Sequence, residues 1–165
     1  MDLDGRFPPS LTFAWDTTSH KDGAICRKQM LVMNEIGKRK LARSGKDISN
    51  PGSIGTLGML LETSGKGAVV DIEKIPMPDG VDLSQWLRAY QGSGFVLTCA
   101  PENSSQVIDI FTGVGVTAAV VGKVDVSQKL VLRMNGQSAQ MFDFKVDKIT
   151  GCDPSKVPGS KKCKC

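Results

Sequence analysis

Apolar side chains recur along this chain at two periods, which predict helices and strands in alternation. Residues 22–43 carry apolar side chains at spacings of about three and four, with Lys and Arg between them, as in an amphipathic helix. Residues 52–64 carry an apolar stripe of the same kind. A short helix is predicted at residues 83–90, with Asp82 as its N-cap, and another over residues 101–112, where a Pro-Glu start suits a helix terminus.

Strands are predicted where apolar residues run continuously or alternate with polar ones. "KLVLRM" and "AQMFDF" alternate on either side of Asn135-Gly136, a dipeptide that favours a two-residue hairpin turn. Residues 46–49 read as a short extended segment. Four further strands are predicted at residues 11–15, 67–72, 94–100 and 116–126.

This order of elements predicts the fold class. Helices alternate with strands and the chain then ends in a meander, which indicates an α+β or layered α/β fold with a mixed sheet covered by helices. We expect one domain over residues 1–150, followed by a flexible tail at residues 151–165 that contains Lys and Cys.

Composition narrows the class of protein. Hydrophobic residues make up 40% and charged residues 23%, which is ordinary for a globular domain and argues against disorder. No apolar run reaches the roughly 18–20 residues that span a bilayer. The start of the chain has no apolar segment of a secretory signal, so a cytoplasmic protein without membrane contact is the expectation.

Charge and cysteine content leave two alternatives open. The net charge of +4 is concentrated in residues 26–46 and in the tail, but aromatic residues are few, so nucleic acid is not an expected partner.

His20, the single histidine, lies in a polar loop as either a functional or a surface residue. The tail could form a zinc site or remain unstructured, because its thiols lack the spacing of a closed site: these are Cys152, Cys163 and Cys165.

The most informative stretch is "KDISNPGSIGTLGMLLETSG", residues 46–65. Glycine recurs at positions 52, 55 and 58, and each glycine inside a helix costs about 1 kcal/mol relative to alanine. Either another element packs against the backbone there, or a phosphoryl ligand approaches the positive helix terminus. A Walker A loop is excluded, since no G-K-[ST] follows. Asp47 is either a Mg²⁺ ligand that faces the phosphates or a cap of its own loop.

Three stretches of the chain resemble the C-terminal domain of the aminoimidazole ribonucleotide (AIR) synthase superfamily. They are "DISNPG" at residues 47–52, "GSGFVLTCAPENSSQVIDIF" at 92–111 and "GVTAAVVGKV" at 115–124. The superfamily includes AIR synthase, the FGAM synthase large subunit, selenophosphate synthetase, thiamine-monophosphate kinase and the hydrogenase maturation protein HypE. The likeness is strongest to the uncharacterised branch of AIR synthase-related proteins. Pro51 replaces a glycine of the usual turn, and nothing in residues 1–45 resembles the N-terminal ATP-binding domain of the superfamily.

The resemblance implies a PurM C-terminal domain-like fold with a mixed sheet of about four to six strands. It implies one wall of a nucleotide cleft in an ATP-dependent synthase or ligase-like enzyme, inactive alone, that activates a small-molecule or protein-linked substrate by phosphorylation. ATP and Mg²⁺ would bind only together with the missing N-terminal domain, and the full-length protein would be a homodimer. Asp47 would be the metal ligand, and the phosphate-facing residues would be Ser49, Asn50, Gly52, Ser53 and Gly55. The alternative is a non-catalytic nucleotide- or protein-binding domain, such as a HypE-like hydrogenase maturation factor.

Overall fold

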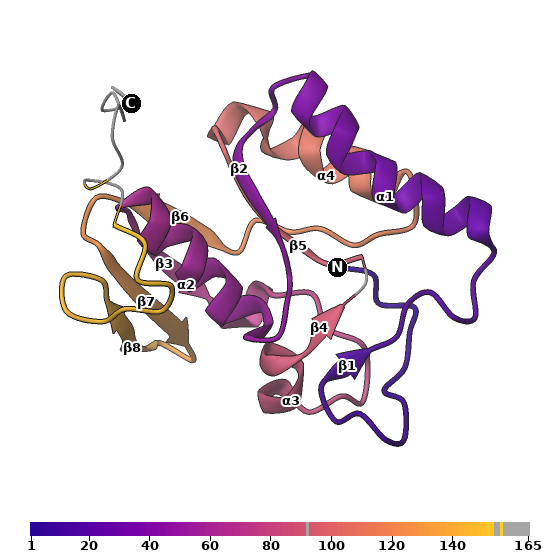
Figure 1. The fold of residues 1–165 in the computed structure, drawn as a ribbon, viewed down its shortest axis with the longest axis horizontal. Helices are drawn as coiled ribbons and strands as arrows, with labels where there is room; N and C mark the ends of the chain where they lie inside the picture. Colours follow the sequence, from indigo (N-terminus) through magenta and orange to yellow (C-terminus); the bar gives the residue numbers. More distant parts are fainter. Residues whose placement is uncertain (92, 154–155, 157–165) are drawn as a thin grey trace. The chain divides into compact units, whose positions relative to one another are not determined.

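The computed structural model of the chain describes residues 1–91, 93–153 and 156. By their contacts these residues divide into two compact units. Unit 1 comprises Met1–Leu57 and Lys74–Val120, and unit 2 comprises Gly58–Glu73 and the described residues from Val121 onward. Figure 1 shows the elements of both units, and each unit is described below by itself.

Unit 1 contains two small sheets and most of the helices. Its strands β2 and β5 pair antiparallel, whereas β1 and β4 pair parallel. The 3₁₀ turn η2 leads directly into α4, and the helix α2, Gly52–Ser64, begins in this unit. The remaining bounds are β1 Ala14–Trp15, α1 Gly23–Lys38, β2 Ala42–Asp47, α3 Leu83–Arg88, β4 Tyr90–Gln91, β5 Phe95–Cys99, η2 Pro101–Asn103 and α4 Ser104–Thr112.

Two apolar clusters form the core of unit 1. In the first, α1 and α4 lie side by side and bury Val32 and Ile36 against Val107 and Phe111. In the second, the rings of Trp15 and Trp86 meet edge to face, with their centroids 5.2 Å apart. These aromatic contacts fix β1 against α3, so they set the position of the strand β4 that follows α3.

Unit 2 is built on a four-stranded mixed sheet of order β6-β3-β7-β8. Strand β3 pairs parallel with β7 and antiparallel with β6, and β7 and β8 form a hairpin. Leu130 on β7 is fully buried. The bounds are β3 Gly67–Asp71, the 3₁₀ turn η1 Ile72–Lys74, β6 Gly122–Asp125, β7 Lys129–Met134 and β8 Gln137–Asp143.

The buried carboxylate of Glu62 fastens the segment 149–151 of unit 2 to α2. Its Oε2 accepts hydrogen bonds from the N–H of Ile149 at 3.3 Å, the N–H of Thr150 at 2.7 Å and the Thr150 hydroxyl at 2.8 Å. Its Oε1 accepts from the N–H of Gly151 at 3.1 Å. Burial raises the pKa of Glu62, but these hydrogen bonds outweigh burial and hold that pKa below its usual value.

Several sequence predictions are confirmed. The mixed α/β class is correct, and α2 occupies the predicted residues 52–64. Asp82 caps α3, because its Oδ1 accepts a hydrogen bond from the N–H of Gln85 at 2.9 Å. The hairpin turn is also present: Asn135 and Gly136 both have positive φ, 51° and 72°, as a type I′ turn requires.

Other element boundaries were predicted wrongly. The helix expected over 22–43 ends at Lys38, because Lys40 adopts φ 54° and the N–H groups of Lys40 and Leu41 close a Schellman motif on Gly37 and Ile36. The chain then forms β2, of which only the last two residues were expected to be extended. The helix predicted at residues 83–90 ends at Arg88, and strand β4, which begins at Tyr90, was missed.

The strand predicted at residues 116–126 is confirmed only from Gly122 to Asp125. Before it, the backbone N–H groups bond outside any ladder: Val116 donates to Phe111 O and Thr117 to Met1 O. Gly122 fits beside β3 because it has no side chain; a Cβ there would lie 2.1 Å from Val69 O.

The tail lies largely outside the described residues. Cys163 and Cys165 belong to that part, so the zinc-site alternative stays a prediction, and Cys152 is exposed. In the described part of the chain, no helix combines the length and the apolar character that crossing a bilayer requires.

Candidate functional site

The candidate site begins at Asp47, the last residue of β2. Its backbone pairs with Phe95 on β5, and its side chain is 65% exposed. Lys46 Nζ lies 3.2 Å from Asp47 Oδ1. The carboxylate is exposed, so a cation from solvent can reach it in competition with Lys46, and the position is compatible with a metal ligand.

The residue after Asp47 is held on both of its backbone polar groups. Ile48 is 2% exposed; its N–H donates to Gly94 O at 2.8 Å, and its carbonyl accepts from the N–H of Gln91 at 3.4 Å. Because Ile48 is held by Gln91, the last residue of β4, and by Gly94 shortly after it, the backbone that carries Asp47 and Ser49 has a defined course.

A tight turn leads from Ser49 into α2. The N–H of Gly52 donates to Ser49 O at 2.8 Å, and the N–H of Ser49 donates to the Thr56 hydroxyl at 3.3 Å. Asn50 is exposed, and Ser49 is half-buried. The first N–H groups of a helix lack intrahelical partners and carry partial positive charge, so this turn lies where an anion is favoured.

The end of α3 packs against the start of α2. Gly52 has φ 70°, and a Cβ atom there would lie 2.1 Å from Leu87 O and 2.6 Å from Arg88 Cα. The buried Ser53 hydroxyl donates to the same Leu87 carbonyl at 3.4 Å. Close packing of α3 therefore requires glycine at position 52, and it covers Gly52 and Ser53.

The other two glycines of the three-residue series also have local reasons. A Cβ at Gly55 would lie 2.4 Å from Pro51 Cβ, one helical turn earlier. In unit 2, a Cβ at Gly58 would lie 2.7 Å from the side chain of Ile149 and 3.5 Å from the ring of Phe142. Close packing thus accounts for the glycine spacing without a ligand.

The predicted site residues therefore differ in accessibility. Asp47 and Asn50 are exposed, Ser49 and Gly55 are partly buried, and Gly52 and Ser53 are buried. These residues follow one another in the β2–α2 connection, so the structure holds them within one local segment. Their roles toward phosphate and metal stay predictions.

Asp47 fits Mg²⁺ only as a single ligand. Within the described residues, no group of three or more His, Cys, Asp or Glu side chains could hold a metal ion. Protein-bound Mg²⁺ takes one or two carboxylates and completes its shell with phosphate oxygens and water. Asp47 would supply one such carboxylate, and the other ligands would come from a nucleotide and another part of the protein.

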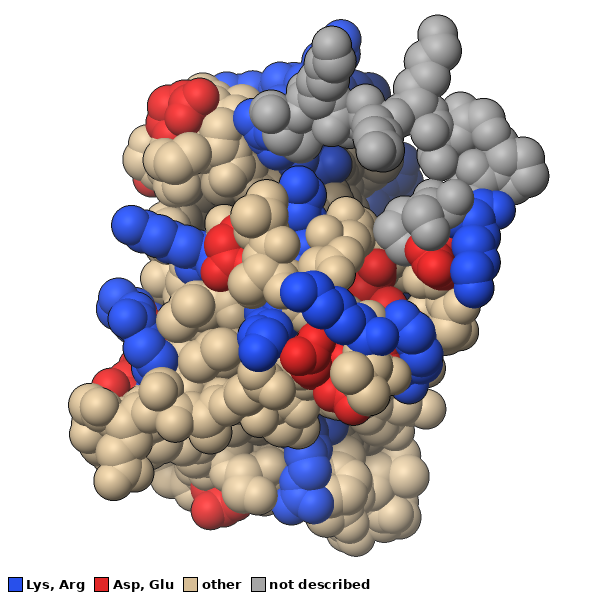
Figure 2. All heavy atoms as spheres, turned by 90° about the vertical axis from the view of Figure 1, so that its left-hand side faces the viewer, with Lys and Arg blue, Asp and Glu red and all other residues tan. Residues whose placement is uncertain are grey.

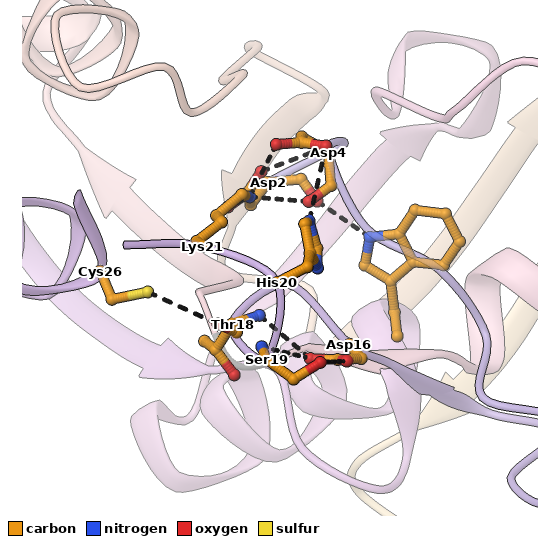
Figure 3. Close-up of polar contacts among 9 residues, drawn as sticks. Asp2, Asp4, Asp16, Thr18, Ser19, His20, Lys21 and Cys26 are labelled. Carbon is orange, nitrogen blue, oxygen red and sulfur yellow. Dashed lines mark hydrogen bonds and ion pairs between the residues drawn. The ribbon is translucent and has the colours of Figure 1, made fainter. Parts of the chain in front are cut away.

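A second polar cluster was missed by the sequence analysis (Figure 3). Lys21 is nearly buried; its Nζ contacts Asp2 Oδ2 at 2.5 Å and Asp4 O at 2.6 Å. His20 Nε2 lies 3.6 Å from Asp4 Oδ1. The ion pair between Lys21 and Asp2 joins residues 19 positions apart, so no local periodicity could indicate it. The only signal in the sequence was a lysine in the polar loop "WDTTSHKD".

In the same loop, the side chain of Asp16 stabilises a turn by accepting hydrogen bonds from the residues that follow it. The Ser19 hydroxyl and the N–H groups of Ser19 and Thr18 donate to the Asp16 carboxylate and hold its pKa well below its usual range. These contacts stabilise the turn before α1, and the loop pattern Asp-x-Thr-Ser was the signal that could have predicted them.

The face of the molecule drawn in Figure 2 carries mixed charge. Figure 2 shows acidic side chains beside basic ones over much of the drawn face. On that face the distribution does not single out a cationic stripe, and the turn after Asp47 stays the candidate site.

Comparison with known proteins decides the family. The family model for AIR synthase related proteins, C-terminal domain, matches residues 14–135, including the whole β2–α2 connection. The chain belongs to this family. An uncharacterized protein of Methanocaldococcus jannaschii is 48% identical over 151 residues, which cover 92% of this chain and 47% of that protein. The chain thus spans about half the length of this relative.

Solved structures share the fold of this AIR synthase-related domain. Thermotoga maritima PurL complexed with FGAR matches with a TM-score of 0.70 and 15% identity, covering 98% of this chain and 27% of that one. E. coli HypE, a hydrogenase maturation protein, matches with a TM-score of 0.57 and 14% identity, covering 68% of this chain and 38% of that one. The PurM C-terminal domain-like fold expected from the sequence is confirmed.

Proposed function

We propose that this AIR synthase-related domain forms one wall of the nucleotide cleft of an ATP-dependent enzyme, and that Asp47 supplies a carboxylate to the Mg²⁺ of the bound nucleotide. The observation that carries the proposal is the placement of an exposed carboxylate at the end of β2, directly before the turn that opens α2. A helix start favours phosphate, and a carboxylate beside phosphate requires a cation between them.

The residues of the β2–α2 connection have different proposed roles, which depend on whether they are accessible to a ligand. The exposed Asn50 amide and the half-buried Ser49 can approach a phosphate oxygen, whereas Gly52 and Ser53 set the backbone of the turn against α3. Phosphoryl transfer depends mainly on positioning and on neutralisation of charge. When bound, Mg²⁺ would neutralise phosphate charge; the chain itself holds the carboxylate and the turn in place.

The relatives support the proposal in two ways. T. maritima PurL, which shares the fold, has been solved in complex with ATP. The M. jannaschii relative is about twice as long as this chain, which leaves room for a second domain to complete the cleft. Homodimer formation, a small-molecule or protein-linked phosphate acceptor, and a cytoplasmic location belong to the same proposal.

The test replaces Asp47 by asparagine in the full-length protein that carries this domain. We expect Mg²⁺-dependent ATP turnover to fall by about a hundredfold or more, because the neutral amide is a much weaker Mg²⁺ ligand, with an unchanged unfolding transition. Asp79→Asn, at an exposed loop aspartate, is the matched control and should retain turnover. Equal turnover in both variants would remove Asp47 from the metal site.

A non-catalytic nucleotide- or protein-binding domain is the second candidate. Its support is the fold shared with HypE, a protein that has also been solved in a HypE–HypF complex. Mg²⁺-ATP binding by the full-length protein without any turnover would favour this candidate over the enzyme.

A further inference from the structure

Unit 1 buries a small group of polar side chains that lack partners: Thr17, Gln91 and Ser93. Their exposed fractions are 1%, 7% and 1%. Over the described residues, five buried side-chain oxygen and nitrogen atoms have no hydrogen-bond partner, and four of them belong to these three residues. They are Thr17 Oγ1, Gln91 Oε1, Gln91 Nε2 and Ser93 Oγ. Buried polar groups are normally satisfied, so this concentration is unusual.

The strand register places these residues at one end of the β1–β4 pair. β1 and β4 are parallel, and Trp15 is paired with Gln91. Thr17 and Ser93 each follow two residues after that pair, so both lie just past the carboxyl ends of neighbouring parallel strands. The group therefore contains one carboxamide and two hydroxyls, with no charged side chain among the atoms that lack partners.

This group adjoins the start of the candidate site. The N–H of Gln91 donates to Ile48 O, and Ile48 N–H donates to Gly94 O. The side chain of Gln91 lies on Gly94, since a Cβ atom there would be 2.9 Å from Gln91 Oε1. The Gln91 carboxamide thus packs against Gly94, whose carbonyl accepts the hydrogen bond from the N–H of Ile48. Ile48 is the residue between Asp47 and Ser49.

The atoms without partners include donors and acceptors, so a ligand that satisfies them must both donate and accept hydrogen bonds, and it must be small because all three side chains are buried. Water meets these conditions, and buried water ordinarily makes about three hydrogen bonds to such groups. We propose that Gln91 is a positioning residue that, with Thr17 and Ser93, binds a buried water and thereby fixes the backbone at Ile48. The relevance of this role to phosphate binding rests on the proposed function; the water site itself does not.

The first test measures hydrogen exchange of the Ile48 amide in the 165-residue chain. Replacing Gln91 by leucine removes the carboxamide at similar volume, and we expect the protection factor of Ile48 to fall by about tenfold or more, beyond any change in the most protected core amides. Gln29→Leu is the matched control, because Gln29 is 3% exposed and also has an atom without a partner, but lies on α1. An equal effect of both variants on Ile48 would overturn the positioning role.

The second test uses Gln91→Glu as a conservative variant. A protonated carboxyl group keeps one donor and one acceptor, whereas a buried carboxylate is disfavoured, so burial raises its pKa. We expect protection of Ile48 to resemble the parent near pH 4 and to be lost near pH 7. A variant equally protected at both pH values would contradict the proposal.

Direct detection of the water completes the test. Water–amide NOEs in the parent chain should show a long-lived water beside Gln91, and the Gln91→Leu variant should lose it. If the parent shows no such water, the proposal fails. No nucleotide is present in these experiments, so their failure leaves the role of Asp47 untouched, and loss of that role leaves the water site untouched.

Discussion

At the scale of single residues, Gly52 controls how α3 meets α2. It combines φ 70° with a Cβ position only 2.1 Å from Leu87 O. We expect Gly52→Ala to lower the free energy of unfolding by about 2–4 kcal/mol, from backbone strain and overpacking together. Urea unfolding followed by circular dichroism measures the loss.

The control variant Gly80→Ala separates backbone strain from overpacking. Gly80 has a similar φ of 74°, but nothing lies within 4 Å of its Cβ position. This control should cost only the strain of the left-handed conformation, about 1–2 kcal/mol. Equal costs at both positions would mean that α3 does not press on Gly52.

Glu62 should make the free energy of unfolding depend on pH. Its folded-state pKa lies below the unfolded value, so its contribution to stability is present above about pH 4.3, the unfolded value, and is lost as pH falls through the folded pKa. We expect Glu62→Gln to destabilise by about 1–3 kcal/mol at pH 7, with the difference shrinking toward pH 3. Urea unfolding at several pH values tests this, and the exposed Glu102→Gln should show no such trend.

At the scale of elements, the short helix α3 depends on its cap. Asp82 accepts from Gln85 N–H, and α3 has six residues, too few to persist without tertiary support. Asp82→Ala should lower the free energy of unfolding by about 1 kcal/mol, whereas Asp82→Asn should retain most of it. If asparagine costs as much as alanine, the hydrogen bond to Gln85 is not the source of the stability.

Elements with strong local signals could be predicted from the sequence. The boundaries of α2, the Asp82 cap and the Asn135-Gly136 hairpin all follow from spacing and turn chemistry within a few residues. Strands β2 and β4 could not be predicted in the same way. β2 has the composition "ARSGKD", which has no strand propensity, and it exists because β5 pairs with it along five registered positions.

The site shows the same division. The sequence marked the β2–α2 connection, because aspartate, serine and glycine are concentrated there. It could not show that Leu87 covers Gly52, or that Gln91 and Gly94 hold Ile48, since these contacts join segments more than 30 residues apart. Long-range contacts produce no periodic pattern in a single sequence, so only the structure could show which residues of the turn are accessible.

At the scale of the whole molecule, this AIR synthase-related chain has about half the length of its M. jannaschii relative. Asp47 supplies one carboxylate, and within the described residues no group of three or more His, Cys, Asp or Glu side chains could hold a metal ion, so the proposed Mg²⁺-nucleotide site needs ligands from outside this chain. We expect the 165-residue chain alone to show no Mg²⁺-dependent ATP turnover, and the full-length relative to show it. A phosphate-release assay on both proteins is the measurement, and turnover by the chain alone would contradict the one-wall proposal.

The contact between Trp15 and Trp86 has a practical consequence for such experiments. They are the only two tryptophans of the sequence; both lie in unit 1, and their rings touch edge to face. Intrinsic fluorescence therefore reports on the aromatic cluster of that unit, and the two indoles should exchange excitation energy as a coupled pair. A fluorescence titration will register changes around β1 and α3 directly, whereas events confined to the four-stranded sheet require a probe placed there, for example Phe142→Trp on β8.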